Sequence, residues 1–346
     1  MKILFIADTH LGYDLPLRPR IDRRRRGHDF FQNYQNALEP AFKGEVDAVL
    51  HGGDLFFRSR VHPNIVSDAF EPLLQIADNG IPVYIVQGNH ERSQIPRSLF
   101  ETHENIFIFD TPSTYTQHFE NLKISFSGFP CVRNGIQGRF KEMVKRTQWQ
   151  QYEANVRFLC MHQAVEGAQV GVQNYTFRFG ADIIRGSDIP PIFDAVLSGH
   201  IHRAQVLPQN LGGVKLGAPV IYPGATERTS FAERGEAKGY FIIEVILNTD
   251  SHRPVVTWNF YTLPTRDMHV IDLNVETLST DHVSEKLKHA LLQYKPDSIV
   301  RFRVNGKISP EVFSVLSNKN LRRLAPPTMN VEFSIPKFYS SNAGTE

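Results

Sequence analysis

The sequence predicts an α/β fold of the sandwich type, in which two β-sheets form a core flanked by helices and a small α+β unit follows. Three observations support this prediction. Short apolar runs alternate with stretches of helical period early in the chain, the apolar runs become shorter from about residue 104, and the alternation restarts near residue 265. We therefore expect one domain over 1–264, a second over 265–336 and a flexible tail over 337–346.

The individual elements follow from the period of the apolar residues. Buried strands are expected at 3–7, 46–50, 81–86, 156–161 and 194–198, with helices at 29–43 and 64–79 between the early ones. Further strands are expected at 122–128, 240–247 and 255–261. The last two have no helix between them, which indicates a second sheet with antiparallel pairing. After residue 265 the expected order is strand 269–275, helix 281–294, strand 298–304, helix 309–318 and strand 330–335.

The charge of the chain is distributed unevenly. The formal net charge is only +2, from 38 Lys and Arg against 36 Asp and Glu. Residues 18–26 alone carry +5 and residues 285–325 carry +6, which leaves −9 for the remainder. Such asymmetry favours a polyanionic partner, although a basic run can also be an ordinary solvated surface.

Composition also limits the cellular setting. The two cysteines, Cys131 and Cys160, match neither a thiolate metal motif nor a disulfide framework. The apolar N-terminus is too short for a signal peptide, and no run approaches the roughly 18 apolar residues of a membrane span. We expect a soluble, cytoplasmic protein that does not enter a membrane.

Side chains that can bind metal follow five of the predicted strands. A lone histidine or aspartate at such a place is usually structural, but five successive strand ends with this property favour a common site, because open sheets bind ligands at the carboxyl ends of their strands. The candidate ligands, in chain order, are Asp8, His10, Asp54, Asn89, His162, His200 and His202, and His90 stands beside them.

The types of side chain indicate the kind of centre. Imidazole and oxygen ligands without thiolate suit Mn, Fe, Zn or a similar divalent ion. Seven ligands are too many for one ion and fit two ions about 4 Å apart. Asp54 is the natural bridge, because each of its two carboxylate oxygens can bind one ion. A two-metal centre supplies hydroxide and stabilises displacement at phosphorus, which makes phosphoester hydrolysis the expected chemistry.

The motifs DTH, HGGD, GNHE, MH and GHIH, in this order and spacing, resemble those of the calcineurin-like metallophosphoesterase family over roughly residues 1–230. The resemblance implies that one metal binds Asp8, His10, Asp54 and His202, and that the other binds Asp54, Asn89, His162 and His200. It also implies that His90 contacts the phosphate and helps to protonate the leaving oxygen, while metal-bound hydroxide attacks phosphorus. Glu91 stands where the family often has aspartate, at a position that is not a ligand.

Three further segments are similar to the SbcD-type nuclease subunit of double-strand-break repair complexes. These are ADTHLG, HGGDLFFRSR and the 222–240 segment YPGATERTSFAERGEAKGY, in which Ala225 replaces the more usual serine. This resemblance implies two divalent ions, expected to be Mn²⁺, DNA as the substrate with exonuclease or endonuclease activity, and a DNA-contacting capping domain after residue 265. It also implies an SbcC-type ABC ATPase as a partner, and a homodimer is compatible with it. The helical docking segment of that group is not found in this chain, so the sequence leaves open whether the partner docks differently, the protein works alone or the chain was trimmed.

The two basic segments supply the candidate DNA contacts, which are Arg23, Arg24, Arg25, Arg26, Arg301, Arg303, Arg322 and Arg323. Two other functions remain open from the sequence. One is a phosphatase or a cyclic or small-molecule phosphodiesterase that acts on nucleotides. The other is a non-catalytic DNA-binding or scaffold subunit, against which the intact ligand set argues.

Overall fold

The computed structural model describes residues 1–16, 23–90, 103–119, 122–247 and 254–335, so the tail expected at 337–346 lies outside the described residues. The chain divides into two compact units. The first comprises Met1–Tyr13 and Asp29–Pro264, and the second comprises Asp14–His28 and Thr265–Glu346.

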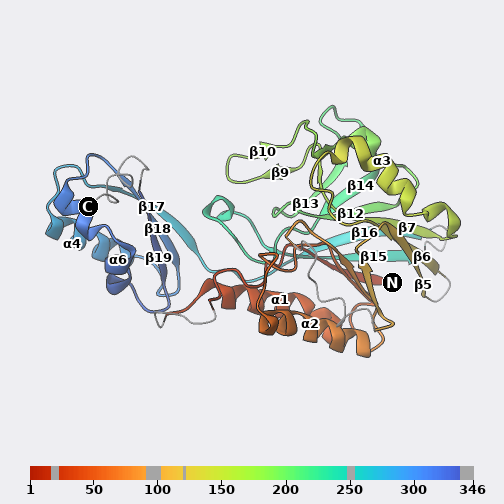
Figure 1. The fold of residues 1–346 in the computed structure, drawn as a ribbon, viewed down its shortest axis with the longest axis horizontal. Helices are drawn as coiled ribbons and strands as arrows, with labels where there is room; N and C mark the ends of the chain where they lie inside the picture. The colour runs from red at the N-terminus through yellow and green to blue at the C-terminus, as the bar shows by residue number, and fades with distance from the viewer. Residues whose placement is uncertain (17–22, 91–102, 120–121, 248–253, 336–346) are drawn as a thin grey trace. The chain divides into compact units, whose positions relative to one another are not determined.

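Two six-stranded sheets form the first unit (Figure 1). In the first sheet β1 to β4 are parallel, whereas β15 is antiparallel to β1 and β16 is antiparallel to β15. The strand order is β16 (Pro254–Thr262), β15 (Gly239–Leu247), β1 (Lys2–Ile6), β2 (Ala48–His51), β3 (Val83–Val86) and β4 (Ile106–Phe109).

The position of β15 and β16 differs from the sequence prediction. These strands pair with each other antiparallel, as predicted, but they extend the first sheet and do not belong to the second. Ile3 of β1 faces Ile243 of β15 in the ladder, and both side chains are fully buried. The alternation of a strand predicts that one of its faces is buried, but it does not identify the neighbouring strand.

The second sheet has a parallel centre and antiparallel edges. β6, β7, β12 and β14 run parallel, and β5 and β13 are the antiparallel edge strands. The order is β13 (Gln205–Gln209), β14 (Lys215–Tyr222), β12 (Ala195–Gly199), β7 (Val156–His162), β6 (Leu122–Gly128) and β5 (Ser113–Phe119).

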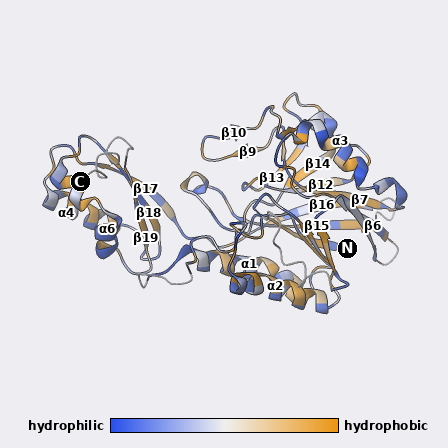
Figure 2. Cartoon of the chain, viewed as in Figure 1, coloured by the Kyte–Doolittle hydropathy of each residue, from blue (hydrophilic) through white to orange (hydrophobic). Residues whose placement is uncertain are grey.

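A hydrophobic core between the sheets makes the first unit a sandwich. Phe5 and Tyr84 of the first sheet and Phe126 and Phe158 of the second belong to one buried cluster. The rings of Tyr84 and Phe126 stack with centroids 4.2 Å apart. Figure 2 shows hydrophobic residues along the strands. The prediction of two packed sheets is therefore confirmed.

Helices and short elements complete the first unit. α2 contacts β3, and α3 contributes Phe140 and Val144 to a second buried cluster that includes residues of β7 and β12. The helices are α1 (Arg26–Phe42), which belongs to this unit from Asp29 on, α2 (Pro63–Asp78) and α3 (Ile136–Arg146). The short strands are β8 (Ala164–Val165), β9 (Gln169–Val170), β10 (Tyr175–Thr176) and β11 (Ile183–Ile184), and 3-10 turns lie at Trp149–Gln151, Gly186–Asp188 and Phe231–Glu233.

The second unit is a three-stranded parallel sheet with three helices. The expected helix 309–318 corresponds to a shorter helix that ends at Val315, and a further helix that the sequence did not predict starts at Asn318, where the side chain of Ser317 accepts a hydrogen bond from the backbone N–H of Asn320. The elements are β17 (Met268–Asn274), α4 (Thr280–Leu291), β18 (Ile299–Asn305), α5 (Pro310–Val315), α6 (Asn318–Leu324) and β19 (Asn330–Ser334).

Asp14–His28 packs within the second unit, whereas the sequence alone assigns it to 1–264. The backbone N–H of Arg24 donates to the carbonyl of Pro327 at 3.3 Å, and the side-chain amide of Asn330 donates to the carbonyl of Arg24 at 3.0 Å. The guanidinium of Arg23 donates to the carbonyls of Arg322, Ala325, Pro326 and Met329. Arg23 and Arg24 thus connect this segment to the last turn of α6 and to the residues that follow it.

Among the residues that the structure describes, the helices are all too short or too polar to cross a bilayer.

Candidate metal centre

All eight predicted site residues come together in the first unit. They lie at or just after the carboxyl ends of β1, β2, β3, β7 and β12, and each of these strands is joined in parallel to a neighbour from the same set. Parallel pairing aligns the carboxyl ends of β1, β2 and β3 in the first sheet and those of β7 and β12 in the second, and the packing of the two sheets brings both sets together. The side chains are Asp8, His10, Asp54, Asn89, His90, His162, His200 and His202, and the two carboxylates are almost completely buried.

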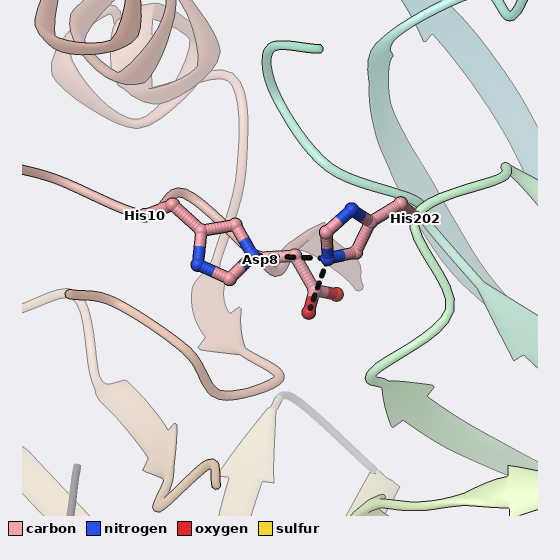
Figure 3. Close-up of side chains that lie close together, drawn as sticks. All are labelled: Asp8, His10 and His202. Carbon is pink, nitrogen blue, oxygen red and sulfur yellow. Dashed lines mark hydrogen bonds and ion pairs between the residues drawn. The ribbon is translucent and has the colours of Figure 1, made fainter. Parts of the chain in front are cut away.

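Asp8, His10 and His202 form one group of possible ligands (Figure 3). Their ligand atoms lie within 4.8 Å of one another. The Nε2 atoms of the two histidines are 3.0 Å apart, and Nε2 of His202 is 3.9 Å from Oδ1 of Asp8. Two imidazole nitrogens and a carboxylate directed at one point are a typical donor set for a divalent cation.

A second set lies around Asn89. Its Oδ1 is 3.1 Å from Nε2 of His162 and 3.0 Å from Nδ1 of His200. Nε2 of His162 is also 3.3 Å from Oδ2 of Asp54. Oxygen and imidazole donors therefore converge here as well.

Asp54 lies between the two sets. It shares one group of possible ligands with His10 and His90, and another with Asp8 and His162. Its Oδ1 accepts a hydrogen bond of 2.9 Å from the backbone N–H of His90. This central position supports the bridging role expected from the sequence.

The backbone of the site is held in an unusual conformation. Asp8, His10, Asp54 and His200 have φ values of 50°, 46°, 54° and 85°, in the left-handed region that side chains rarely adopt. Backbone hydrogen bonds fix two of them, since the N–H of Asp8 donates to the carbonyl of Gly53 at 2.9 Å and that of His10 donates to the carbonyl of Asp54 at 3.1 Å. Strained residues of this kind concentrate at functional sites.

Two glycines allow the close approach of the segments. A Cβ at Gly53, whose φ is +104°, would lie 2.4 Å from Nδ1 of His162. A Cβ at Gly88 would lie 2.2 Å from Oδ1 of Asp54. The glycines of HGGD and QGNHE therefore make room for the neighbouring metal-binding side chains.

Burial and ion pairing shift the pKa values in the site. Burial raises the pKa of Asp8 to about 6, lowers that of His10 well below its ordinary value and lowers that of His200 to about 3. Burial opposes the charged forms of Asp54 and His162, but their ion pair outweighs it, so the pKa of Asp54 falls well below its usual range and that of His162 rises to about 9. Lowered pKa values favour the neutral imidazoles of His10 and His200, which is the form that binds a metal.

His90 is oriented differently from the other histidines. Its Nδ1–H donates to the carbonyl of Phe57 at 2.7 Å, which leaves Nε2 directed toward the centre, 3.8 Å from Oδ2 of Asp54. An imidazole held in this way can transfer a proton at Nε2.

No role was predicted from the sequence for Glu233, a carboxylate beside one of the possible metal ligands. Glu233, within the noted 222–240 segment, is 3.3 Å from Nδ1 of His202. Its burial was the missing signal, since a buried carboxylate normally has a specific partner.

The candidate DNA-contacting arginines lie in different environments. Arg301 pairs with Glu332, and Arg303 pairs with Asp272 at 2.6 Å. Arg23 is engaged by backbone carbonyls, Arg25 is 3.3 Å from Asp14, and Arg26 is buried at the start of α1. Arg24 and Arg323 are exposed and Arg322 is half-buried.

The fold and the donor set define a metal-dependent phosphoesterase. A family model described as calcineurin-like phosphoesterase matches residues 1–204, and the chain therefore belongs to this family. The resemblance inferred from the sequence is confirmed.

Relatives of this chain include proteins of DNA repair. The DNA double-strand break repair protein Mre11 of Methanococcus maripaludis is 25% identical over 252 residues, which cover 70% of this chain and 62% of the relative. Mre11 of Sulfurisphaera tokodaii is 24% identical over 339 residues, 94% of this chain and 79% of the relative. The uncharacterized metallophosphoesterase YhaO of Bacillus subtilis is 25% identical over 315 residues, 88% of this chain and 69% of the relative. This chain thus spans less than two thirds of the Methanococcus protein.

Proposed function

We propose that this protein is a two-metal phosphodiesterase that cleaves DNA in repair, in the cytoplasm, with Mn²⁺ as the metal. The convergence of seven donor side chains in two sets, with Asp54 between them, is the observation that carries the proposal. Similarity to DNA double-strand break repair proteins supports DNA as the substrate, and an SbcC-type ATPase is a proposed partner because of the resemblance of the sequence motifs.

Each side chain has a task in this proposal. One metal would be held by Asp8, His10, Asp54 and His202, and the other by Asp54, Asn89, His162 and His200. When bound, the two ions activate a water molecule and stabilise the charge that develops on the phosphate.

His90 acts on the leaving group. Because Nδ1 is held by the Phe57 carbonyl, the proton that His90 transfers is carried on Nε2, on the side of the buried carboxylates. It would pass to the departing sugar oxygen, whose high basicity makes its release slow without a proton.

DNA contact is proposed for the basic surface of the second unit. Arg322 and Arg323 lie in the last turn of α6, where their side chains make no ion pair within the described residues. Arg301 and Arg303 face carboxylates across neighbouring strands, so we expect them to contribute less to phosphate binding.

The test compares DNA with a small diester. With Mn²⁺, the wild-type protein should hydrolyse linear duplex DNA and bis-p-nitrophenyl phosphate, and it should act weakly on nucleotides. Reversing the charge of Arg322 and Arg323 to glutamate should weaken DNA binding and flatten its salt dependence, while hydrolysis of the small diester stays unchanged.

Lys145 and Arg146 provide the matched control, because they are an exposed basic pair in the last turn of α3 in the first unit. Their reversal to glutamate should leave DNA binding largely intact. Hydrolysis of nucleotides with no cleavage of DNA would replace the proposal with a nucleotide phosphatase or small-molecule phosphodiesterase.

A further inference from the structure

A buried carboxylate lies directly behind the metal-facing histidine of the last motif. Nε2 of His202 points toward Asp8 and His10, and its other ring nitrogen, Nδ1, is 3.3 Å from Oε1 of Glu233. Glu233 ends the 3-10 turn Phe231–Glu233 and is only 6% exposed. One ring nitrogen of His202 thus points toward the possible metal ligands, and the other points toward a carboxylate.

Hydroxyl groups hold the oxygen of Glu233 that faces His202. Oε1 accepts a hydrogen bond of 2.6 Å from Thr229 and one of 3.2 Å from Ser230. With its position fixed from the other side, this oxygen is a defined acceptor for an N–H at Nδ1 of His202.

Lys238 compensates the charge of Glu233. Its Nζ is 2.7 Å from Oε2 of Glu233 and 3.1 Å from Oε2 of Glu236, and it donates to the backbone carbonyl of His202 at 2.8 Å. Lys238 is 1% exposed. A buried carboxylate is stable only with such a partner, so the lysine holds both Glu233 and the main chain of the ligand residue.

Two other histidines of the site have backbone carbonyls, which are weaker acceptors, at Nδ1. Nδ1 of His162 donates to the carbonyl of Gly52 at 2.8 Å, and Nδ1 of His90 donates to the carbonyl of Phe57 at 2.7 Å. Within the described part of the site, only His202 has a carboxylate behind its ring in addition to the ligand group in front. A carboxylate acceptor fixes the tautomer and makes the opposite nitrogen a stronger ligand.

We propose that Glu233, held by Lys238, is a positioning residue that keeps the proton of His202 on Nδ1 and the lone pair of Nε2 directed at the metal. This inference rests on the proposed function, since it assumes that His202 is a ligand. It assigns a role to the part of the 222–240 segment for which the sequence suggested none.

The test is a titration of metal-free protein with Mn²⁺, followed by calorimetry and by the electron paramagnetic resonance signal of the unbound ion. Glu233→Ala should weaken one of the two binding steps by about 10- to 100-fold and leave the other close to wild type. Glu233→Gln retains an acceptor oxygen without the charge, so its affinity should lie between those of the alanine variant and the wild type.

Glu236→Gln is the matched control. It removes a carboxylate from the same network, where Glu236 pairs with Lys238 and with Arg203 at 3.1 Å, and its carboxylate pairs with no ligand side chain. Both Mn²⁺ affinities should remain near wild type in this variant. Equal weakening by Glu236→Gln and Glu233→Ala would overturn the inference, because the effect would then belong to the network as a whole.

Two further outcomes are decisive. If the wild-type protein binds two ions and Glu233→Ala binds them equally well, the positioning role is wrong while the proposed function stands. If the wild-type protein does not bind two ions, the proposed metal centre itself fails. Should Glu233→Ala not fold in a thermal melt, the glutamine variant decides, and wild-type affinity in that variant overturns the inference.

Discussion

Replacing Asp54 with asparagine is expected to reduce the rate of hydrolysis of every substrate by about 1,000-fold. This is the upper end of the loss that follows removal of one electrostatic stabiliser. The amide side chain would offer one neutral oxygen in place of two charged ones, and it could not bridge two cations. The remaining oxygen can still accept the N–H of His90, so the loop should keep its course.

The measurement is kcat/KM on bis-p-nitrophenyl phosphate together with the Mn²⁺ content of the variant. Asp272→Asn is the control, since it also removes a carboxylate from an ion pair, but in the second unit, with Arg303. Retention of two tightly bound ions by Asp54→Asn would show that this carboxylate is not the bridge.

Replacing His90 with asparagine is expected to lower DNA cleavage by about 10²- to 10⁴-fold, the usual contribution of a general acid. Mn²⁺ binding should persist, because His90 is outside the proposed ligand sets. The loss should be much smaller for bis-p-nitrophenyl phosphate, whose nitrophenolate departs readily without a proton.

The contrast between the two substrates is the critical result. His118→Asn, a change of an exposed histidine on β5, should alter neither rate. An equal loss on DNA and on the small diester would mean that His90 acts on the phosphate alone and does not protonate the leaving oxygen.

The sequence predicted which side chains come close together because each of them is marked by a local signal. Each ligand lies within a few residues of the end of a strand, and parallel pairing aligns these ends within each of the two sheets. Asp8 and Asp54 follow strands of the first sheet and His162 ends a strand of the second, so their meeting across up to 154 positions also depends on the packing of the two sheets.

Contacts between segments far apart in the chain could not be predicted from the sequence in the same way. The strands 240–247 and 255–261 have a clear alternation, but only the ladder of Ile3 with Ile243 places them in the first sheet. Arg23 belongs to a basic run that suggests a solvated loop or a phosphate contact, and its hydrogen bonds to carbonyls about 300 residues away in the chain have no signal in that pattern.

The claim that two metal ions share Asp54 is tested most directly by anomalous X-ray scattering at the manganese absorption edge, from crystals prepared with Mn²⁺. Two peaks about 4 Å apart are expected on either side of the Asp54 carboxylate. One should be in contact with Asp8, His10 and His202, and the other with Asn89, His162 and His200. A single peak, or peaks that do not contact Asp54, would contradict this account.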